Sequence, residues 1–395
     1  MVMNDDQNEP ARPGAVGSEP EHITTTTRDP AEVEAVLGRW LQGQLGEEAS
    51  PEIIECTSPQ GNGMSSETLL FTARWRDVAT GEVGQHDLVA RIEPPAGAYP
   101  VFTTYDLAMQ YRVMQLVGEA TRVPVPTMLF FEADPTFLGG PFFVMSRVDG
   151  RVPPDVLPYT FGDNWVFDAS DEERTALEAS ALRALAGVHS ISPADFDLSF
   201  VDPDVGTDRD ALSAHLDHWE EYHHWVVEDR PSPLLTEAFS WLRQHQPAST
   251  GDDVLSWGDS RIGNMMFQGF DVVAVLDWEM ASVAPREVDL GWMCYLHLFF
   301  QDLAVDLGAP GLPAMFTPSG VRRVYEDVSG VQVGDLKWYI AYAAIRHGVI
   351  MRRVTERSIF FGENEAPEDI DDLIMHRATI EGMLDGTYWD RPVFA

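Results

Sequence analysis

The strongest limit on the fold and chemistry of this chain comes from a stretch in its second half, WGDSRIGNMMFQGFDVVAVLDWEM. Three polar residues, Asp259, Asn264 and Asp277, stand in it against an apolar background. The residues between the last two are typical of a hairpin. If Met265 lies opposite Leu276, the next pair toward the open end consists of the amide and the second acid. Those side chains would lie roughly 5 Å apart, a separation that a divalent metal can bridge.

These three side chains are of the types that phosphoryl transfer from a nucleotide requires. Asp259 can accept or orient the proton of a hydroxyl group, while oxygens of Asn264 and Asp277 can hold Mg²⁺ against the phosphates. A structural alternative stays open, in which the first two are turn residues and Asp277 caps the next helix. The spacing of all three favours the functional interpretation.

Length and charge limit the class of the protein and its partners. A chain of 395 residues suits two lobes. Its 64 acidic and 26 basic residues give a net charge of −38, which argues against a nucleic-acid partner. The acidic surface can attract a cationic substrate, although an acid-rich source proteome also explains the charge. The two cysteines, Cys56 and Cys294, lie far apart in sequence, so a reducing cytoplasm fits better than a disulfide framework.

The organisation of the chain follows from changes in composition. Residues 1–25 are polar, acidic and proline-rich, which predicts a disordered acidic tail. This tail lacks the features of a signal peptide, and no apolar run is long enough to span a bilayer, so we expect a cytoplasmic protein with no membrane partner. Residues 26–148 are expected to form a first lobe and residues 149–395 a second.

The first lobe is predicted to be rich in strands, with one helix after a short helix that starts at Asp29. The strands are expected at residues 53–56, 68–75, 87–93, 128–132 and 142–148, and the helix at 105–117. The chain has a single lysine, Lys337, outside this lobe, so Arg91 is the candidate cation for nucleotide phosphates. The alternative is a strand-end arginine that reaches solvent. The glycine-containing loop before residue 68 can cover phosphates or be a plain turn.

The second lobe is predicted to be mainly helical. Helices are expected at residues 172–191, 211–229, 234–243 and 335–354, with a last helix near the end of the chain. His189 is expected to be a buried histidine with satisfied hydrogen bonds. Residues 215–225 are dense in aromatics, histidines and acids, and they form either a pocket for a cationic or polyhydroxy substrate or a core stripe with a solvated face.

Three segments together resemble a known family. The sequence WGDSRIGN is similar to the HGDxxxxN loop of the aminoglycoside phosphotransferase and choline kinase family, LDWE to its IDWE segment, and PREVDL to its PxxxDL stretch. The resemblance covers roughly residues 35–360. It implies a protein-kinase-like α+β fold, with a small β-rich nucleotide-binding lobe and a larger, mainly helical lobe for catalysis and acceptor binding.

The resemblance also implies roles for individual residues. Asp259 would be the catalytic base or hydroxyl-orienting acid, and Asn264 and Asp277 the Mg²⁺ ligands. Arg261 would face the transferred phosphate, and Arg91 would replace the strand lysine that contacts the α- and β-phosphates. The other positions implied in nucleotide binding are Gly61, Gly63, Ser65 and Ser66 in the phosphate loop, Ser146 and Val148 in the adenine hinge, and Gln110 on the helix. Asp289 would brace the catalytic loop rather than touch substrate.

Three positions depart from the family pattern. Trp257 replaces a histidine beneath the loop, and arginine replaces lysine at position 91. Gln110 replaces the glutamate that pairs with the strand cation, which would turn an ion pair into a neutral hydrogen bond roughly half as strong. These departures keep open a catalytically weak or inactive kinase-like nucleotide-binding module. A metal hydrolase that uses Asp277 and Glu279 is a third hypothesis.

The favoured hypothesis is a small-molecule O-phosphotransferase that uses ATP or GTP with Mg²⁺. Its acceptor would be a small hydroxylated molecule, aminoglycoside-like or another metabolite, and a cationic one fits the acidic charge. Within the family, acceptors include aminoglycosides, choline, ethanolamine and hydroxyacyl compounds. The sequence does not choose among them, because a fold does not fix its substrate.

Overall fold

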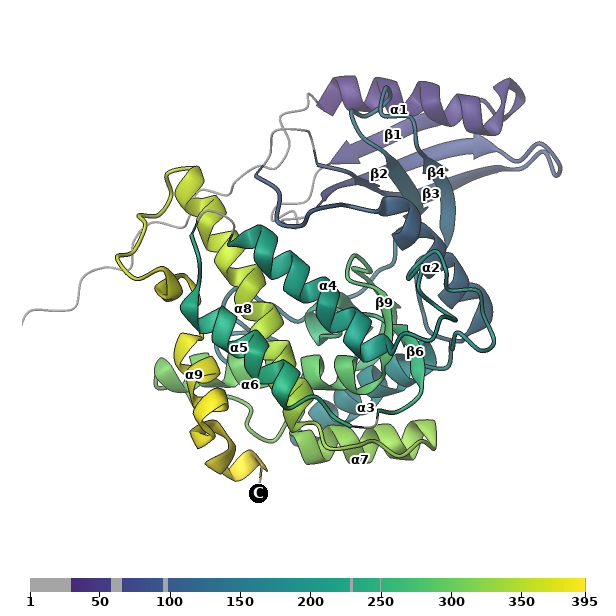
Figure 1. Cartoon of the computed structure of the whole chain (residues 1–395). Coiled ribbons are helices and arrows are strands. Elements are labelled where there is room, and N and C mark those ends of the chain that lie inside the picture. The colour runs from purple at the N-terminus through teal and green to yellow at the C-terminus, as the bar shows by residue number, and fades with distance from the viewer. Residues whose placement is uncertain (1–29, 58–65, 95–98, 228–229, 249, 395) are drawn as a thin grey trace, which may run out of the picture.

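The computed structural model describes residues 30–57, 66–94, 99–227, 230–248 and 250–394, and these form an α+β fold of two lobes (Figure 1). In Figure 1 the purple and dark blue elements at the top right form a strand-rich lobe, and the larger lobe below it is mainly helical. This architecture confirms the predicted fold class. None of the described helices is both long and apolar enough to cross a membrane.

The strand-rich lobe is built on one antiparallel sheet. Its strands are β1 (Glu52–Thr57), β2 (Glu67–Arg76), β3 (Val83–Ile92), β4 (Met128–Glu132) and β5 (Phe142–Ser146). They lie in the order β1-β2-β3-β5-β4, and each neighbouring pair is antiparallel. The chain therefore enters the second lobe from β5, which is an inner strand of this sheet.

The two faces of the sheet bury different cores. Helix α1 (Pro30–Leu45) packs on one face, where Leu88 and Ala90 of β3 belong to its hydrophobic cluster. Val89 belongs instead to the main core, together with α2 (Leu107–Ala120) and the second lobe. Because side chains alternate along a strand, Arg91 emerges on the same face as Val89. The strand periodicity thus directs this arginine toward the space between the lobes.

Helix α2 starts two residues later than the sequence pattern predicted. Asp106 is its N-cap, and the carboxylate accepts a hydrogen bond of 2.8 Å from the backbone N–H of Met109. A side-chain cap satisfies one of the free N–H groups of a first helical turn, so it fixes where the helix begins. The buried stripe of α2 includes Gln110 between apolar residues.

The second lobe is an assembly of helices around α6. The helices are α3 (Asp171–Val188), α4 (Ala211–Val226), α5 (Pro233–Gln244), α6 (Glu287–Asp306), α7 (Pro318–Ser329), α8 (Lys337–Phe360) and α9 (Arg377–Asp385). Single turns of 3₁₀ helix span Glu47–Ala49, Ile262–Asn264, Ile370–Leu373, Thr387–Asp390 and Pro392–Phe394. Helix α6 is buried on nearly all sides, as expected for a helix at the centre of a lobe. The helices expected from the sequence included neither the span of α6 nor any part of α7.

Two short strand pairs flank the loop that contains Asp259. The strand β6 (Asp253–Ser256), which precedes this loop, pairs with β9 (Ser282–Pro285), which follows the hairpin. This pair was not predicted, because four residues are too few to show a strand period. The pairing closes the stretch between β6 and β9 into one compact unit.

The predicted hairpin is present, but its predicted register is wrong by one residue. Strands β7 (Met265–Gln268) and β8 (Asp271–Val275) pair with Met265 opposite Val275. A bulge between Met266 and Phe267 shifts the pairing, and the turn is closed by Gln268 opposite Asp271. The N–H of Leu276 donates to the carbonyl of Asn264 at 2.9 Å. Asp277 therefore lies one residue beyond the pairing partner of Asn264.

Candidate functional site

The loop between β6 and β7 is fixed from below by Asp289 of α6. The buried carboxylate of Asp289 accepts hydrogen bonds from the backbone N–H groups of Trp257 (2.7 Å) and Gly258 (2.9 Å). His189, which is 2.9 Å from Asp289 and from the hydroxyl of Tyr325, is a satisfied buried histidine as predicted. Burial by itself raises the pKa of Asp289, but the hydrogen bonds outweigh burial and leave the pKa below its ordinary value. Asp289 thus braces the loop.

Gly258 is required by the close approach of another segment. Its φ is 90°, a conformation that favours glycine, and a Cβ there would lie 2.0 Å from the carbonyl oxygen of Met280. The neighbouring Trp257 is fully buried and donates from Nε1 to the carbonyl of Leu276 at 2.9 Å. The tryptophan that replaces the family histidine is therefore a packing element beneath the loop.

Asp259 is surrounded by hydrogen-bond donors from three residues. Arg261 Nε lies 3.1 Å from both carboxylate oxygens, and Asn264 Nδ2 lies 2.7 Å from Oδ2. Trp292 Nε1 donates to Oδ1 at 2.7 Å. The sequence did not single out Trp292, although it lies three residues after Asp289 and hence on the same side of the first turns of α6. The loop, through Arg261 and Asn264, and helix α6, through Trp292, together orient the carboxylate of Asp259.

Arg261 is held between two carboxylates. It pairs with Asp259 and, through Nη1, with Asp155 in the loop after β5. Burial lowers the pKa of Arg261, and the charges of Asp259 and Asp155 more than reverse this effect, so its pKa is raised. No sequence pattern pointed to Asp155, because 106 residues separate it from its partner. In this structure the guanidinium of Arg261, which the resemblance implied would face the transferred phosphate, contacts the carboxylates of Asp259 and Asp155.

Asp277 has the features expected of a cation ligand. It is a non-glycine residue at a φ of 59°, so the chain turns sharply after β8. Its buried Oδ1 has no hydrogen-bond partner in the described structure and lies 3.8 Å from Nη2 of Arg91. Burial raises the pKa of this carboxyl, against the effect of the nearby arginine. A buried oxygen without a donor fits a bound divalent cation.

Asn264 lies at the same end of the hairpin as Asp277. Its amide nitrogen is used in hydrogen bonds to the backbone oxygen (3.1 Å) and to Oδ2 of Asp259. Its amide oxygen accepts none of the hydrogen bonds found in the described chain, so it can act as a metal ligand. No group of three or more His, Cys, Asp or Glu residues suited to a metal occurs among the described residues. Two protein oxygens plus phosphate oxygens are nevertheless a normal Mg²⁺ environment.

An apolar cavity of about 320 Å³ adjoins Asp277 between the lobes. Its lining includes four of the predicted nucleotide-site residues, Arg91, Gln110, Ser146 and Val148. In the hinge, the N–H groups of Ser146 and Arg147 already donate to the carbonyls of Thr127 and Asp87, both at 2.9 Å. The N–H of Val148 forms no such bond in the described chain, so it is the hinge donor available to a planar base.

The remaining predicted nucleotide contacts are only partly described. Ser66 is buried beside the start of β2, whereas Gly61, Gly63 and Ser65 lie outside the described residues. Gln110 is buried, but Arg91 donates its hydrogen bond to Thr68 at 3.2 Å and not to this amide. The expected pairing of Gln110 with Arg91 is therefore replaced by a cross-strand contact, since Thr68 lies opposite Arg91 in the sheet.

A second cavity, of about 410 Å³, meets the first at Gln110, which lines both. Residues 276–278 line the apolar cavity and residues 279–283 line the second, so the segment after β8 separates them. The carboxylates that line the second cavity are Asp106, Asp202, Asp204, Asp217, Glu221 and Glu279. Arg209, the one arginine among the described residues that line this cavity, already pairs with two of them. Burial lowers the pKa values of His215 and His218, which leaves both uncharged near neutral pH.

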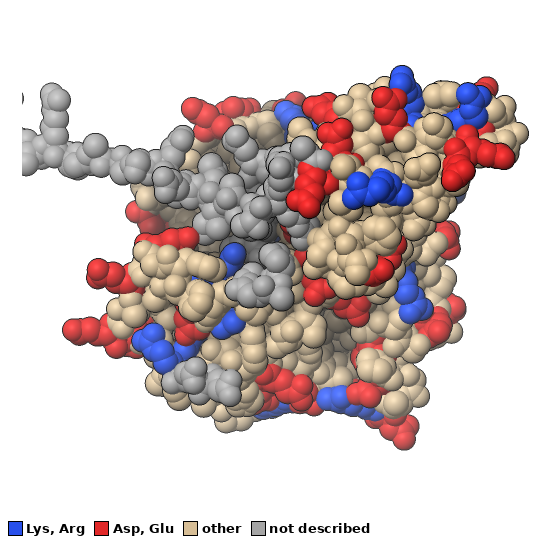
Figure 2. All heavy atoms as spheres, turned by 90° about the horizontal axis from the view of Figure 1, so that it is seen from above, with Lys and Arg blue, Asp and Glu red and all other residues tan. Residues whose placement is uncertain are grey.

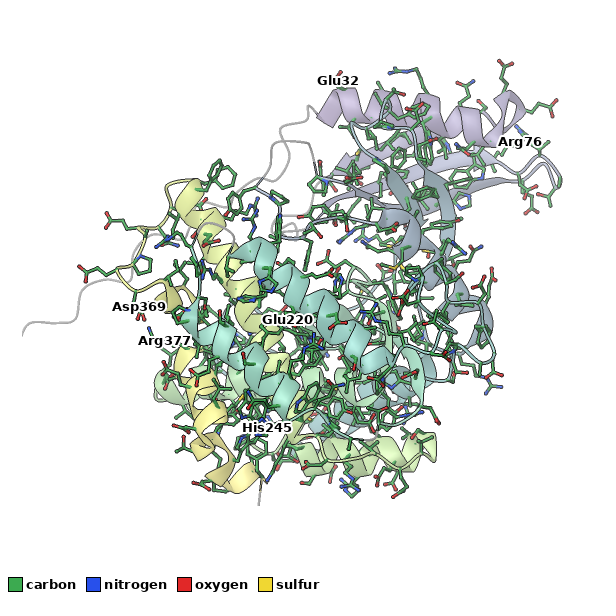
Figure 3. The ribbon with its side chains drawn as sticks, in the orientation of Figure 1. Glu32, Arg76, Glu220, His245, Asp369 and Arg377 are labelled. Carbon is green, nitrogen blue, oxygen red and sulfur yellow. The ribbon has the colours of Figure 1, made fainter. Side chains whose placement is uncertain are left out.

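Helix α4 contributes to this second cavity and to the core at once. Trp219 and Tyr222 are buried and also line the cavity, so part of the segment belongs to the core, as one interpretation predicted, while the substrate-pocket interpretation stays a prediction. Arg243 of α5 donates to Glu220 of α4 at 3.1 and 2.7 Å and so links the two helices. Figure 3 labels Glu220 on α4. On the face shown in Figure 2, acidic side chains lie at several places with basic ones among them. The carboxylates that line the cavity itself would favour a cationic ligand.

Comparisons with known proteins agree with this geometry. A model of the phosphotransferase enzyme family matches residues 68–314, which is more than half of the chain. Acyl-CoA dehydrogenase family member 11 of Homo sapiens is 24% identical over 247 residues, 61% of this chain and 29% of that protein. Family member 10 of Mus musculus is 24% identical over 291 residues, 70% of this chain and 25% of that protein. The chain spans no more than about a third of the length of these relatives.

Solved structures share the fold. A candidate aminoglycoside phosphotransferase from Ralstonia eutropha has a TM-score of 0.61 at 22% identity, over 90% of this chain and 97% of its own. The aminoglycoside phosphotransferase APH(4)-Ia in complex with ADP and hygromycin B has a TM-score of 0.52 at 14% identity, over 88% and 98%. Ethanolamine kinase of Plasmodium vivax has a TM-score of 0.53 at 12% identity, over 91% and 88%.

Proposed function

Because this chain belongs to the phosphotransferase enzyme family, we propose that it transfers the γ-phosphoryl group of ATP or GTP to a hydroxyl of a small molecule. The observation that carries the proposal is the position of Asp277. Its Oδ1 atom has no hydrogen-bond partner in the described structure, and Asp277 lines an apolar cavity that Arg91 also lines. The hairpin of β7 and β8 joins Asp277 to the loop of Asp259. The proposed proton acceptor, the proposed Mg²⁺ ligands and the proposed phosphate-binding arginine would therefore act on one reaction centre.

In the proposed reaction the residues around Asp259 divide the work. The carboxylate of Asp259 accepts the hydroxyl proton of the acceptor, while Trp292 keeps Oδ1 oriented. Asn264 and Asp277 would hold Mg²⁺, which neutralises charge on the phosphates. The guanidinium of Arg261 lies beside Asp259. Once the guanidinium leaves its present carboxylate partners, it can reach the transferred phosphoryl group. Proton transfer and charge neutralisation are thus assigned to different side chains.

The nucleotide would occupy the apolar cavity. Its base would lie against the hinge with Val148 N–H as donor, and its phosphates would extend toward Arg91. Ser66 and the loop with Gly61, Gly63 and Ser65 would cover the phosphates. In this proposal residues 26–148 form the nucleotide-binding lobe, and residues 149–395 the catalytic and acceptor-binding lobe. Two free cysteines suit the reducing cytoplasm that supplies such nucleotides.

The acidic second cavity would receive the acceptor. Six carboxylates and one arginine give its lining a formal charge of −5 with neutral histidines, so we propose a hydroxylated amine or another cationic alcohol. Hygromycin B in the APH(4)-Ia complex and the ethanolamine of the kinase name are molecules of this kind. A hydroxylated acyl compound is the second candidate, because the curated relatives are named as acyl-CoA dehydrogenases.

A panel assay separates these possibilities. The protein is incubated with Mg²⁺ and either ATP or GTP, together with aminoglycosides, small amino alcohols or hydroxylated acyl compounds, and phosphorylated products are followed by ³¹P NMR. Transfer to a cationic alcohol is expected. Nucleotide binding by calorimetry without transfer to any acceptor would favour the catalytically weak module instead. Absence of both binding and transfer would refute the proposal.

A further inference from the structure

Arg346 of α8 is a buried cation without a carboxylate partner. Only 1% of the surface of Arg346 is accessible to solvent, and no carboxylate of the described chain lies within ion-pair distance of its guanidinium. Its Nε and Nη1 atoms are buried and form no hydrogen bond with the described residues. Burying an unpaired guanidinium is costly, so its position requires a compensating interaction.

The compensation comes from aromatic faces and from the catalytic loop. The guanidinium carbon lies 4.3 Å from the ring centre of Trp292, 5.0 Å from that of Trp219 and 5.2 Å from that of Tyr342. Its Nη2 donates to the carbonyl of Gly258 at 3.3 Å. A desolvated cation over indole rings is a strong form of cation–π contact. Arg346 therefore touches both the loop backbone before Asp259 and the indole that hydrogen-bonds to it.

The charge of Arg346 also balances the acids of the loop. Burial lowers the pKa of this guanidinium, while the negative charges of Asp289 and Asp259 act in the opposite direction. These two acids are the brace of the loop and its proposed proton acceptor. The guanidinium of Arg346 therefore experiences the negative charge of both acids without forming a direct ion pair with either.

We propose that Arg346 is a positioning residue, which holds Trp292 and the Gly258 carbonyl, and through them the carboxylate of Asp259, in the geometry for phosphoryl transfer. The inference rests on the proposed function, since it concerns the same acid. It adds a residue that contacts neither nucleotide nor metal and acts through two contacts of the loop. Because Trp219 also lines the acidic cavity, the same cation connects the wall of that cavity with Asp259.

Steady-state kinetics provide the first test, with Arg352 as matched control. Arg352 is also a fully buried arginine of α8, but it pairs with Glu356 at 3.0 Å and lies away from the loop contacts. Arg346→Met is expected to lower kcat roughly 10- to 100-fold with nucleotide KM changed by less than about twofold, because orientation and not binding is lost. The kcat of Arg346→Lys should lie between those of wild type and Arg346→Met. An equal loss of kcat in Arg352→Met, or a change confined to KM, would overturn the proposal.

A spectroscopic test needs no activity, so it separates this proposal from the proposed function. The indole N–H resonance of Trp292 is identified in ¹⁵N-indole-labelled protein by its absence in Trp292→Phe. It should move in Asp259→Asn and in Arg346→Lys but not in Arg352→Met. A resonance that Arg346→Lys leaves in place would refute the positioning role even in a protein that transfers phosphate. If wild type transfers no phosphate, the proposed function fails while this coupling can still be measured.

Trp292→Phe keeps the test decisive if Arg346→Met does not fold. It retains the aromatic face for Arg346 but removes the donor to Asp259. We expect its kcat to fall about as much as that of Arg346→Lys. The double variant Trp292→Phe/Arg346→Lys should lose less kcat than the product of the two single losses, because both changes act through one hydrogen bond. Fully multiplicative effects would contradict the proposal.

Discussion

Nη2 of Arg91 lies 3.8 Å from Oδ1 of Asp277, across the boundary between the sheet of the first lobe and the hairpin of the second. This separation is too long for a hydrogen bond, so the pair is a loose ion pair inside an apolar cavity. The arrangement leaves both charges available to a third partner. A phosphate bound to the arginine and a cation bound to the carboxylate would each improve on the present contact.

Asp277→Asn should separate metal binding from stability. The neutral amide removes the cost of a buried charge without a donor, so the melting temperature without ligands should stay equal or rise. The tightening of nucleotide binding by Mg²⁺ should fall by about tenfold or more. Thermal shifts with nucleotide, with and without Mg²⁺, measure both effects. Asp271→Asn, at the exposed end of the same hairpin, is the control and should leave the Mg²⁺ effect intact.

Asp259→Asn should abolish transfer and spare nucleotide binding. Loss of a general base lowers kcat by about 10²- to 10⁴-fold, whereas the cavity proposed to bind nucleotide does not include this residue. Transfer is measured by product formation and binding by calorimetry. Asp306→Asn, exposed at the end of α6, should change neither. Full activity in Asp259→Asn would remove this acid from its proposed role.

Glu178 should make stability depend on pH near neutrality. Burial raises its pKa from an ordinary 4.5 to about 7, although the N–H of Phe316 and the charge of Arg323 oppose the rise. The folded state therefore binds the proton more tightly, and this stabilisation is present below about pH 4.5 and is lost as pH rises through about 7. Urea unfolding should show a loss on the order of 2–3 kcal/mol across that interval.

Glu178→Gln should flatten this pH profile and make the protein more stable than wild type at about pH 8, because a neutral side chain has no charge to bury. Glu172→Gln, an exposed change on the same helix, should leave the profile unchanged. Equal pH profiles for wild type and Glu178→Gln would show that another group is responsible.

Gly258→Ala should prevent a stable catalytic loop. Its positive φ and the carbonyl of Met280 at 2.0 Å from a new Cβ leave no room, so strain and displacement together should cost about 4 kcal/mol or more. Gly269→Ala shares the positive φ but meets nothing within 4 Å, and should cost about 1 kcal/mol. Denaturant unfolding of both variants compares the two costs. Similar losses would mean that backbone conformation alone, and not crowding, determines the requirement for glycine.

Much of the fold could be predicted because neighbouring residues encode it. Alternation along β3 and the helical stripe of α2 mark elements whose burial depends on local period. The strands β6 and β9 escaped prediction because each has only four residues and finds its partner across the hairpin. The register of β7 and β8 was wrong by one residue because it depends on where the turn closes and on one bulge, and no periodic pattern reveals either position.

The candidate reactive groups can be read along the chain, since the loop of Asp259, the pair Asn264 and Asp277, and the lysine-poor first lobe are all visible in the sequence. Which side chains orient these groups depends on the tertiary structure. Trp292 reaches Asp259 across 33 residues and Asp155 reaches Arg261 across 106. Such contacts depend on how α6, α8 and the loop after β5 pack together, and a local pattern carries no information about packing between distant segments.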